Sequence, residues 1–154
     1  MIRIEDLSKN YGSVQAVNSI SFSLNDGEIV GFLGANGAGK STTLKMITGY
    51  LTPSAGNVYV DDKNIIDDCL DIQKFIGYLP ELNPLYTEMK VHEYLKFHAS
   101  IRGIEGTDFN NALKKVVADC GLQGVVHRTV GNCSKGYKQR IGLAAAMILS
   151  LIHI

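Results

Sequence analysis

Glycines and a lysine between residues 34 and 42 have the types and spacing needed to bind phosphate groups. Gly34 is followed, after four residues, by Gly39, Lys40 and Ser41, which matches the pattern G-x-x-x-x-G-K-[ST]. Glycine lets the backbone turn tightly, so that its N–H groups and the N-terminus of a following helix can surround an anion. In such a loop the lysine reaches the β- and γ-phosphates of a nucleotide, and the serine hydroxyl holds Mg²⁺. The residues that we expect to line this phosphate site are Gly34, Asn36, Gly37, Ala38, Gly39, Lys40, Ser41 and Thr42.

Two regular elements must position this loop. The run Glu28–Leu33 is mostly apolar, which predicts a buried strand, and Lys40–Thr48 predicts a helix with Leu44 and Ile47 on one face. Gly49 follows as the expected helix cap. Further strands are predicted at Met1–Leu7, Ala16–Leu24, Asn57–Val60, Lys63–Ile66 and Phe75–Leu79.

The second half of the chain has helical patterns. Apolar residues recur there at the spacing of one helix face, and Thr87 has the side chain expected of an N-cap. The predicted helices are residues 87–102, 107–120, 135–148 and a short one at 68–74. The change from mixed to helical patterns suggests a helical insert on an α/β core.

The composition limits the class of protein. A chain of 154 residues, 45% of them hydrophobic, is long enough for one domain with its own core. Its 15 basic and 15 acidic residues cancel, so no basic field favours nucleic acid as a partner. The three cysteines lack a C-x-x-C pair, which indicates a reducing compartment. The most apolar stretch, Ile141–Ile154, is shorter than the about 20 residues of a spanning helix, so we expect a cytoplasmic protein.

Three more segments carry a resemblance to a known family. They are Tyr11-Gly12, Tyr78-Leu-Pro-Glu81 and Ser134-Lys-Gly-Tyr-Lys-Gln-Arg140. Together with the loop at residues 34–42, they resemble the nucleotide-binding domain of ATP-binding cassette (ABC) transporters, and look similar to ATP-binding subunits of bacterial drug-efflux and gliding-motility exporters. The resemblance implies an α/β P-loop NTPase of the ABC ATPase type, with an N-terminal antiparallel β subdomain and a helical insert. It implies a nucleotide-binding core at residues 1–86, a helical insert with the signature helix at 87–148, and a non-matching tail at 149–154.

The resemblance also implies roles for four residues outside the loop. Tyr11 would stack on adenine. Glu81 stands where the family usually has glutamine, and would contact Mg²⁺ and the attacking water. Ser134 and Gly136 would touch the γ-phosphate of ATP bound to a partner subunit. Three of these residues have a plainer alternative, namely a strand-end tyrosine for Tyr11, a surface acid for Glu81 and an ordinary N-cap for Ser134. The signature departs from the family's L-S-G-G-Q at Cys133, Lys135 and Tyr137.

The resemblance implies ATP and Mg²⁺ as cofactors, and it also implies two protein partners. One is an integral membrane permease subunit of an exporter, and the other is a second ATP-binding subunit in a head-to-tail dimer. The chain would then lie on the inner face of the cell membrane. A soluble P-loop NTPase unrelated to transport is an alternative, although the sequence has no guanine-reading N-K-x-D pattern. An inert fragment that binds nucleotide weakly is another.

The family continues beyond the signature helix with an apolar strand that ends in Asp-Glu. These acids support Mg²⁺ and polarise the attacking water, whereas residues 149–154 contain no acid. We therefore expect a chain truncated before that strand, with no catalytic acidic base, which binds ATP but hydrolyses it poorly. His153 is not expected to be the family's catalytic histidine.

Overall fold

Two units make up the structure, a computed structural model that describes the backbone of residues 1–150 and the side chains of residues 1–148. The first unit is Met1–Gln73, and the second begins at Lys74. The division expected from the resemblance, with a core at 1–86 and an insert at 87–148, stays a prediction. Of the tail expected at 149–154, residues 149 and 150 continue the last helix, and residues 151–154, His153 included, lie outside the described residues.

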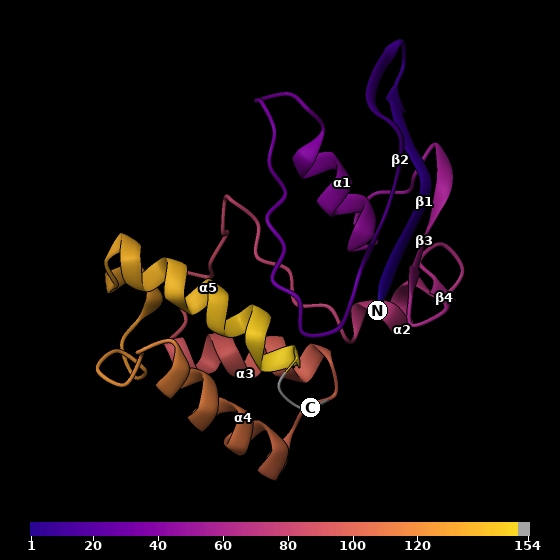
Figure 1. Ribbon diagram of the computed structural model, residues 1–154. Helices are drawn as coiled ribbons and strands as arrows, with labels where there is room; N and C mark the ends of the chain where they lie inside the picture. Colours follow the sequence, from indigo (N-terminus) through magenta and orange to yellow (C-terminus); the bar gives the residue numbers. More distant parts are fainter. Residues whose placement is uncertain (151–154) are drawn as a thin grey trace. The chain divides into compact units, whose positions relative to one another are not determined.

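An antiparallel sheet in the order β2-β1-β3-β4 is the frame of the first unit. The predicted strands of this region are confirmed, except that the one predicted at Lys63–Ile66 ends at Asn64. In addition, β1 runs on to Tyr11 and β2 begins at Val14. The reason is a two-residue turn in which Gly12 adopts a φ of 58°, so that Tyr11 pairs with Val14. The strands, seen side by side in Figure 1, are β1 (Ile2–Tyr11), β2 (Val14–Leu24), β3 (Ala55–Val60) and β4 (Lys63–Asn64).

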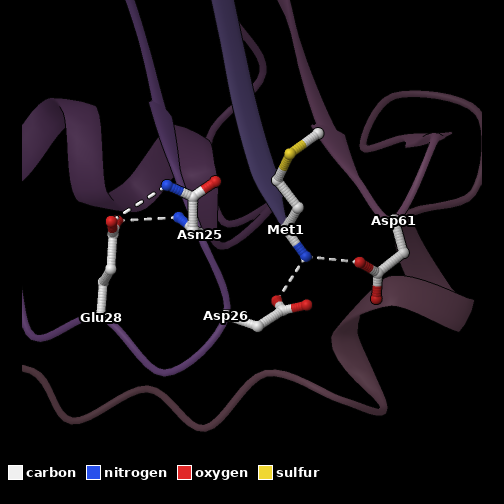
Figure 2. A network of polar contacts seen from close by, with 5 residues as sticks. All are labelled: Met1, Asn25, Asp26, Glu28 and Asp61. Atoms are coloured by element: carbon white, nitrogen blue, oxygen red, sulfur yellow. Dashed lines mark hydrogen bonds and ion pairs between the residues drawn. The ribbon is translucent and has the colours of Figure 1, made fainter.

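Ion pairs hold the start of β1 to the turns that follow both of its neighbours (Figure 2). In an antiparallel sheet the beginning of a central strand lies beside the ends of the strands that flank it. The Met1 amino nitrogen lies 2.6 Å from Asp26 Oδ1 and 2.6 Å from Asp61 Oδ1, and these hydrogen bonds raise the pKa of the amino group. In the turn after β2, Asn25 donates from its side chain and its backbone to Glu28, which lowers the pKa of that carboxyl group.

Helix α1 (Lys40–Ile47) lies beside β2, and the short helix α2 (Cys69–Gln73) ends the first unit. Leu44 and Ile47, predicted to share one face, differ in burial, because the helix buries Thr43, Met46 and Ile47 and leaves Leu44 43% exposed. Gly49 ends the helix with a φ of 69°, so the predicted cap is confirmed.

Residues 28–33 and 75–79 are not strands, so both of these predictions are wrong for the described chain. Ile29 is fully exposed and Leu33 is 92% exposed, although a buried strand was expected there. A strand exists through hydrogen bonds to a neighbouring strand, and within residues 1–150 no strand pairs with either segment. The apolar composition of residues 28–33 suits a buried strand but does not supply the partner.

Three α-helices form the second unit within the described residues, and a short 3₁₀ helix, η1 (Val130–Asn132), precedes the last of them. The predicted helices are confirmed to within a few residues: α3 (Val91–Ile101), α4 (Gly106–Asp119) and α5 (Lys135–Ser150). Their facing sides share one apolar core, whose fully buried members include Val91, Leu95, Val116, Leu122, Ile141 and Ile148. None of the helices described in residues 1–150 has the length and apolar character to cross a membrane.

The expected N-cap at Thr87 is wrong, because the backbone of Thr87 pairs with the segment before α5. Its carbonyl oxygen accepts a hydrogen bond of 2.8 Å from the Gly131 N–H. Lys90 caps α3 instead, and its backbone N–H donates to the Glu93 carboxylate at 2.9 Å. Pairing between distant segments thus overrides a local cap preference.

Candidate nucleotide-binding site

The phosphate-binding pattern forms an open loop that ends directly on α1. Gly37 and Gly39 adopt left-handed φ values of 83° and 82°, and Gly39 is the N-cap of α1. Only glycine takes this conformation without strain. A hydrogen bond of 3.2 Å from the Ala38 N–H to the Ala35 carbonyl tightens the loop. The loop is therefore shaped so that backbone N–H groups can surround an anion at a helix N-terminus.

Gly39 also packs against strand β2. A Cβ atom on Gly39 would overlap the carbonyl oxygen of Ala16 and lie 3.0 Å from Cγ2 of Val17. Glycine is therefore required at this position for a second reason, because there is no room for a side chain between the loop and β2. Thr43, almost fully buried, fixes the same point, because its Oγ1 donates to the Gly39 carbonyl at 3.0 Å.

The side chain of Lys40 folds back into the loop. Its Nζ donates to the carbonyl oxygens of Gly34 at 2.8 Å and Ala35 at 2.6 Å. The first turn of α1 contains no acidic residue, so the positive end of the helix dipole is not neutralised there. Ser41 is exposed in the same turn, and its hydroxyl group makes no hydrogen bond to the described residues, which leaves it open to a ligand.

Tyr11 is carried by the same sheet that supports the loop. It is the last residue of β1, its side chain is 49% exposed, and it pairs with Val14. Ala16, against which Gly39 packs, follows Val14 by two residues, or about 7 Å along β2. The β1–β2 hairpin thus positions both the aromatic ring and the loop.

Glu81 belongs to the second unit, on a segment that runs along α5. Close approaches fix this segment: a Cβ on Gly77 would overlap the Ala146 carbonyl, and a Cβ on Gly142 would overlap the Asn83 side chain. Asn83 also donates to the Lys138 carbonyl at 3.3 Å. Glu81 itself is exposed. It lines a cavity of about 510 Å³ together with Leu82, Asn83, Leu85, Thr87, Lys135, Lys138 and Gln139.

The predicted signature segment begins helix α5 as expected. Ser134 Oγ accepts a hydrogen bond of 3.4 Å from the Tyr137 N–H, and the Ser134 carbonyl accepts one of 2.9 Å from the Lys138 N–H, so Ser134 acts as an N-cap. Ser134 and Gly136 are exposed, and a Cβ on Gly136 would meet nothing within 4 Å. The first turn of α5 carries no acid, so this helix end is open to an anion.

The structure thus brings the predicted residues together in two groups. Tyr11 and the loop with Ser41 lie in the first unit, and Glu81 lies near the start of α5 in the second. Two residues near the predicted site were not identified from the sequence, Thr43 and Lys9. Thr43 bonds to the Gly39 carbonyl, and the Lys9 Nζ lies over the Tyr11 ring at 5.6 Å from its centroid. The signal for Lys9 was its spacing of two residues from Tyr11 on a strand.

A metal ion at this site would depend on the nucleotide. Among residues 1–150 no three His, Cys, Asp or Glu side chains are grouped so as to hold a metal by themselves. Mg²⁺ commonly takes one or two protein oxygens and completes its shell with phosphate and water. The free hydroxyl group of Ser41 at the start of α1 fits that mode of binding.

Comparison with known proteins gives one consistent result. The family model described as ABC transporter matches residues 17–151. The chain is 36% identical over 148 residues to the uncharacterized ABC transporter ATP-binding protein YxlF of Bacillus subtilis, and 36% identical to the bacitracin transport ATP-binding protein BcrA of Bacillus licheniformis. These alignments cover 96% of this chain and 48% and 47% of the relatives, so the chain spans about half the length of the curated relatives it matches.

A solved structure of an ATP-binding subunit of an ABC transporter superposes with a TM-score of 0.87 at 28% identity, covering 96% of this chain and 62% of the other. A dimeric bacterial ABC transporter cassette, at 24% identity and a TM-score of 0.84, supports the fold alone. The expected fold class is thereby confirmed for the part of the domain that this chain covers.

Proposed function

Because the chain belongs to the ABC transporter family, we propose that it is part of an ATP-binding subunit that couples ATP binding and hydrolysis to export through a membrane partner. Its relatives support the proposal, since they are named as ABC transporter and bacitracin transport ATP-binding proteins. The family match over residues 17–151 does not favour a soluble P-loop NTPase unrelated to transport.

The observation that carries the proposal is the position of Lys40. Its ammonium group bridges two loop carbonyls, those of Gly34 and Ala35, at the positive end of α1. A bound phosphate would offer anionic oxygens to the ammonium group in place of these neutral carbonyl oxygens, and the attraction between opposite charges would favour that exchange. These bonds keep the ammonium group beside the backbone of the loop, which supports its proposed role as the cation that binds the phosphates.

The other residues of the first unit complete the proposed site. Adenine stacks on the exposed ring of Tyr11, and the loop residues Asn36, Gly37 and Ala38 present backbone N–H groups to the phosphates. Ser41 would ligate Mg²⁺ together with phosphate oxygens. When bound, Mg²⁺ neutralises charge on the β- and γ-phosphates.

The second unit would serve the metal and a neighbouring subunit. Glu81 would contact Mg²⁺ and the attacking water, while Ser134 and Gly136 would bind the γ-phosphate of ATP held by a second ATP-binding subunit in a head-to-tail dimer. The exposure of all three residues supports these roles. A membrane permease subunit is the other partner and holds the protein at the inner face of the cell membrane. In this arrangement residues 1–86 act as the core and 87–148 as the insert with the signature helix.

The 154-residue chain tested by itself should bind ATP better than it hydrolyses it. Glu81 is the only carboxylate that we assign to the site, and its role is to hold the metal. A positioned general base contributes about 10²- to 10⁴-fold to such a reaction. Single-turnover hydrolysis as fast as in a complete ABC cassette would contradict this part of the proposal.

The binding claim is tested by equilibrium titration with Mg-ATP. Lys40→Ala should lose most of the affinity, because it removes the charge aimed at the phosphates. The matched control is Lys45→Ala, which removes an exposed lysine from the last turn of the same helix. Equal affinity of Lys40→Ala and the unmodified chain would overturn the assignment.

A further inference from the structure

Lys9 covers one face of the Tyr11 ring. The two residues are two positions apart on β1, so their side chains leave the strand on the same side. The Lys9 Nζ lies over the ring at 5.6 Å from its centroid, within the range in which a cation is attracted to an aromatic face. The Tyr11 side chain is nevertheless 49% exposed, so part of the ring surface is open.

The ammonium group of Lys9 is itself fixed by the segment that follows α1. Its Nζ donates to the Thr52 carbonyl oxygen at 2.7 Å. The same segment is joined to β1 on both sides of Lys9, because the Ser54 N–H donates to the Ser8 carbonyl at 2.9 Å and the Asn10 N–H donates to Ser54 Oγ at 3.1 Å. Lys9 is therefore held by contacts within the chain, and it connects the aromatic ring to the segment that leaves the phosphate-binding helix.

We propose that Lys9 is a positioning residue for the base: it holds one face of the Tyr11 ring, so that the adenine of a bound nucleotide stacks on the opposite face. This inference rests on the proposed function, because it needs a nucleotide whose phosphates occupy the loop. A ring fixed before binding loses less side-chain freedom when the base arrives. A cation on the far face also draws electron density away from the near face, which favours stacking with an electron-rich purine.

The test compares two ligands, Mg-ATP and Mg-tripolyphosphate, which has the phosphates but no base. Lys9→Met keeps the length of the side chain and removes its charge, whereas Lys9→Arg keeps a cation over the ring. Lys63→Met is the matched control, since it removes an exposed lysine from β4 of the same unit. We expect Lys9→Met to weaken ATP binding about two- to fivefold and to leave tripolyphosphate binding unchanged. Lys9→Arg and Lys63→Met should bind both ligands as the unmodified chain does.

Tyr11→Leu separates this inference from the proposed function. In that background Lys9→Met should have no further effect on ATP, because the ring through which it acts is gone. Equal weakening of both ligands by Lys9→Met would show a general loss of positive charge and overturn the proposal, as would unchanged ATP binding. If Tyr11→Leu itself leaves ATP binding unchanged, base stacking fails as well, and with it that part of the proposed function.

Discussion

Gly39 packs so closely on Ala16 that the phosphate-binding loop and strand β2 share a contact which no side chain at position 39 would allow. The contact joins the N-terminus of α1 to the hairpin that carries Tyr11. The sites expected for the phosphates and for the base are therefore joined by direct packing within the first unit.

Gly39→Ala should disrupt the loop. An alanine must adopt the left-handed φ of 82°, at a cost of about 1–2 kcal/mol, and its Cβ would overlap the Ala16 carbonyl. We expect the affinity for Mg-ATP, measured by equilibrium titration, to fall at least about tenfold. Gly31→Ala is the control, because a Cβ there meets nothing within 4 Å and the backbone is not left-handed. Unchanged affinity of Gly39→Ala would show that the loop tolerates a different backbone.

Gly142→Ala should destabilise the second unit by displacing the segment that carries Glu81. The new methyl group would overlap the Asn83 side chain and lie 2.9 Å from Leu79 Cδ1; such overpacking costs about 1–3 kcal/mol, which exceeds the about 0.5–1 kcal/mol that alanine gains over glycine inside a helix. Denaturant unfolding measures the loss. Adding Asn83→Ala to the variant should restore part of the stability, because it makes room for the methyl group. Gly136→Ala, on the same helix but in open space, should cost nothing, and an equal loss there would refute the packing argument.

His98 should make the stability of the second unit depend on pH. Burial lowers the pKa of His98, with a smaller contribution from the charge of Arg102, and its Nε2 is buried without a hydrogen-bond partner in the described residues. Because the folded state then binds fewer protons than the unfolded state, stability is constant above the unfolded pKa of about 6.5 and falls as the pH drops through it. His98→Gln should reduce the fall in melting temperature between about pH 7.5 and 5. His127→Gln, an exposed histidine of the same unit, should leave that fall unchanged. Identical pH profiles for all three chains would contradict the prediction.

The loop and the helices could be predicted because local sequence signals encode them. Features that depend on residues distant in the sequence could not be predicted. The glycine spacing and the helix after it are encoded within residues 34–49. The strand expected at 28–33 failed because pairing partners are not a property of the segment itself. The prediction of an N-cap at Thr87 was wrong because the Thr87 carbonyl accepts a hydrogen bond from the Gly131 N–H. The Lys9–Tyr11 contact also needs the Thr52 carbonyl, which is 43 residues away in sequence.

Residues 28–33 should make the isolated chain prone to aggregate. Ile29 and Leu33 expose apolar side chains on a segment without a strand partner in the described residues, and such segments pair between chains. The double variant Ile29→Ser, Leu33→Ser should scatter less light on warming and keep the same melting temperature, because neither side chain is buried. Leu70→Ser, which removes an exposed leucine from α2, is the control and should change neither property. A lower melting temperature of the double variant would show that the two side chains are buried after all.

Hydrogen exchange with and without Mg-ATP tests the central claim most directly, because it reports where on the chain the nucleotide binds. The amide groups of residues 34–42 should exchange more slowly when phosphates accept their hydrogen bonds, and residues around Tyr11 should follow. Lys40→Ala should abolish this protection at the same ATP concentration. If exchange in residues 34–42 is the same with and without ATP, or if Lys40→Ala is protected as strongly as the unmodified chain, the loop does not bind the nucleotide and the proposed function is wrong.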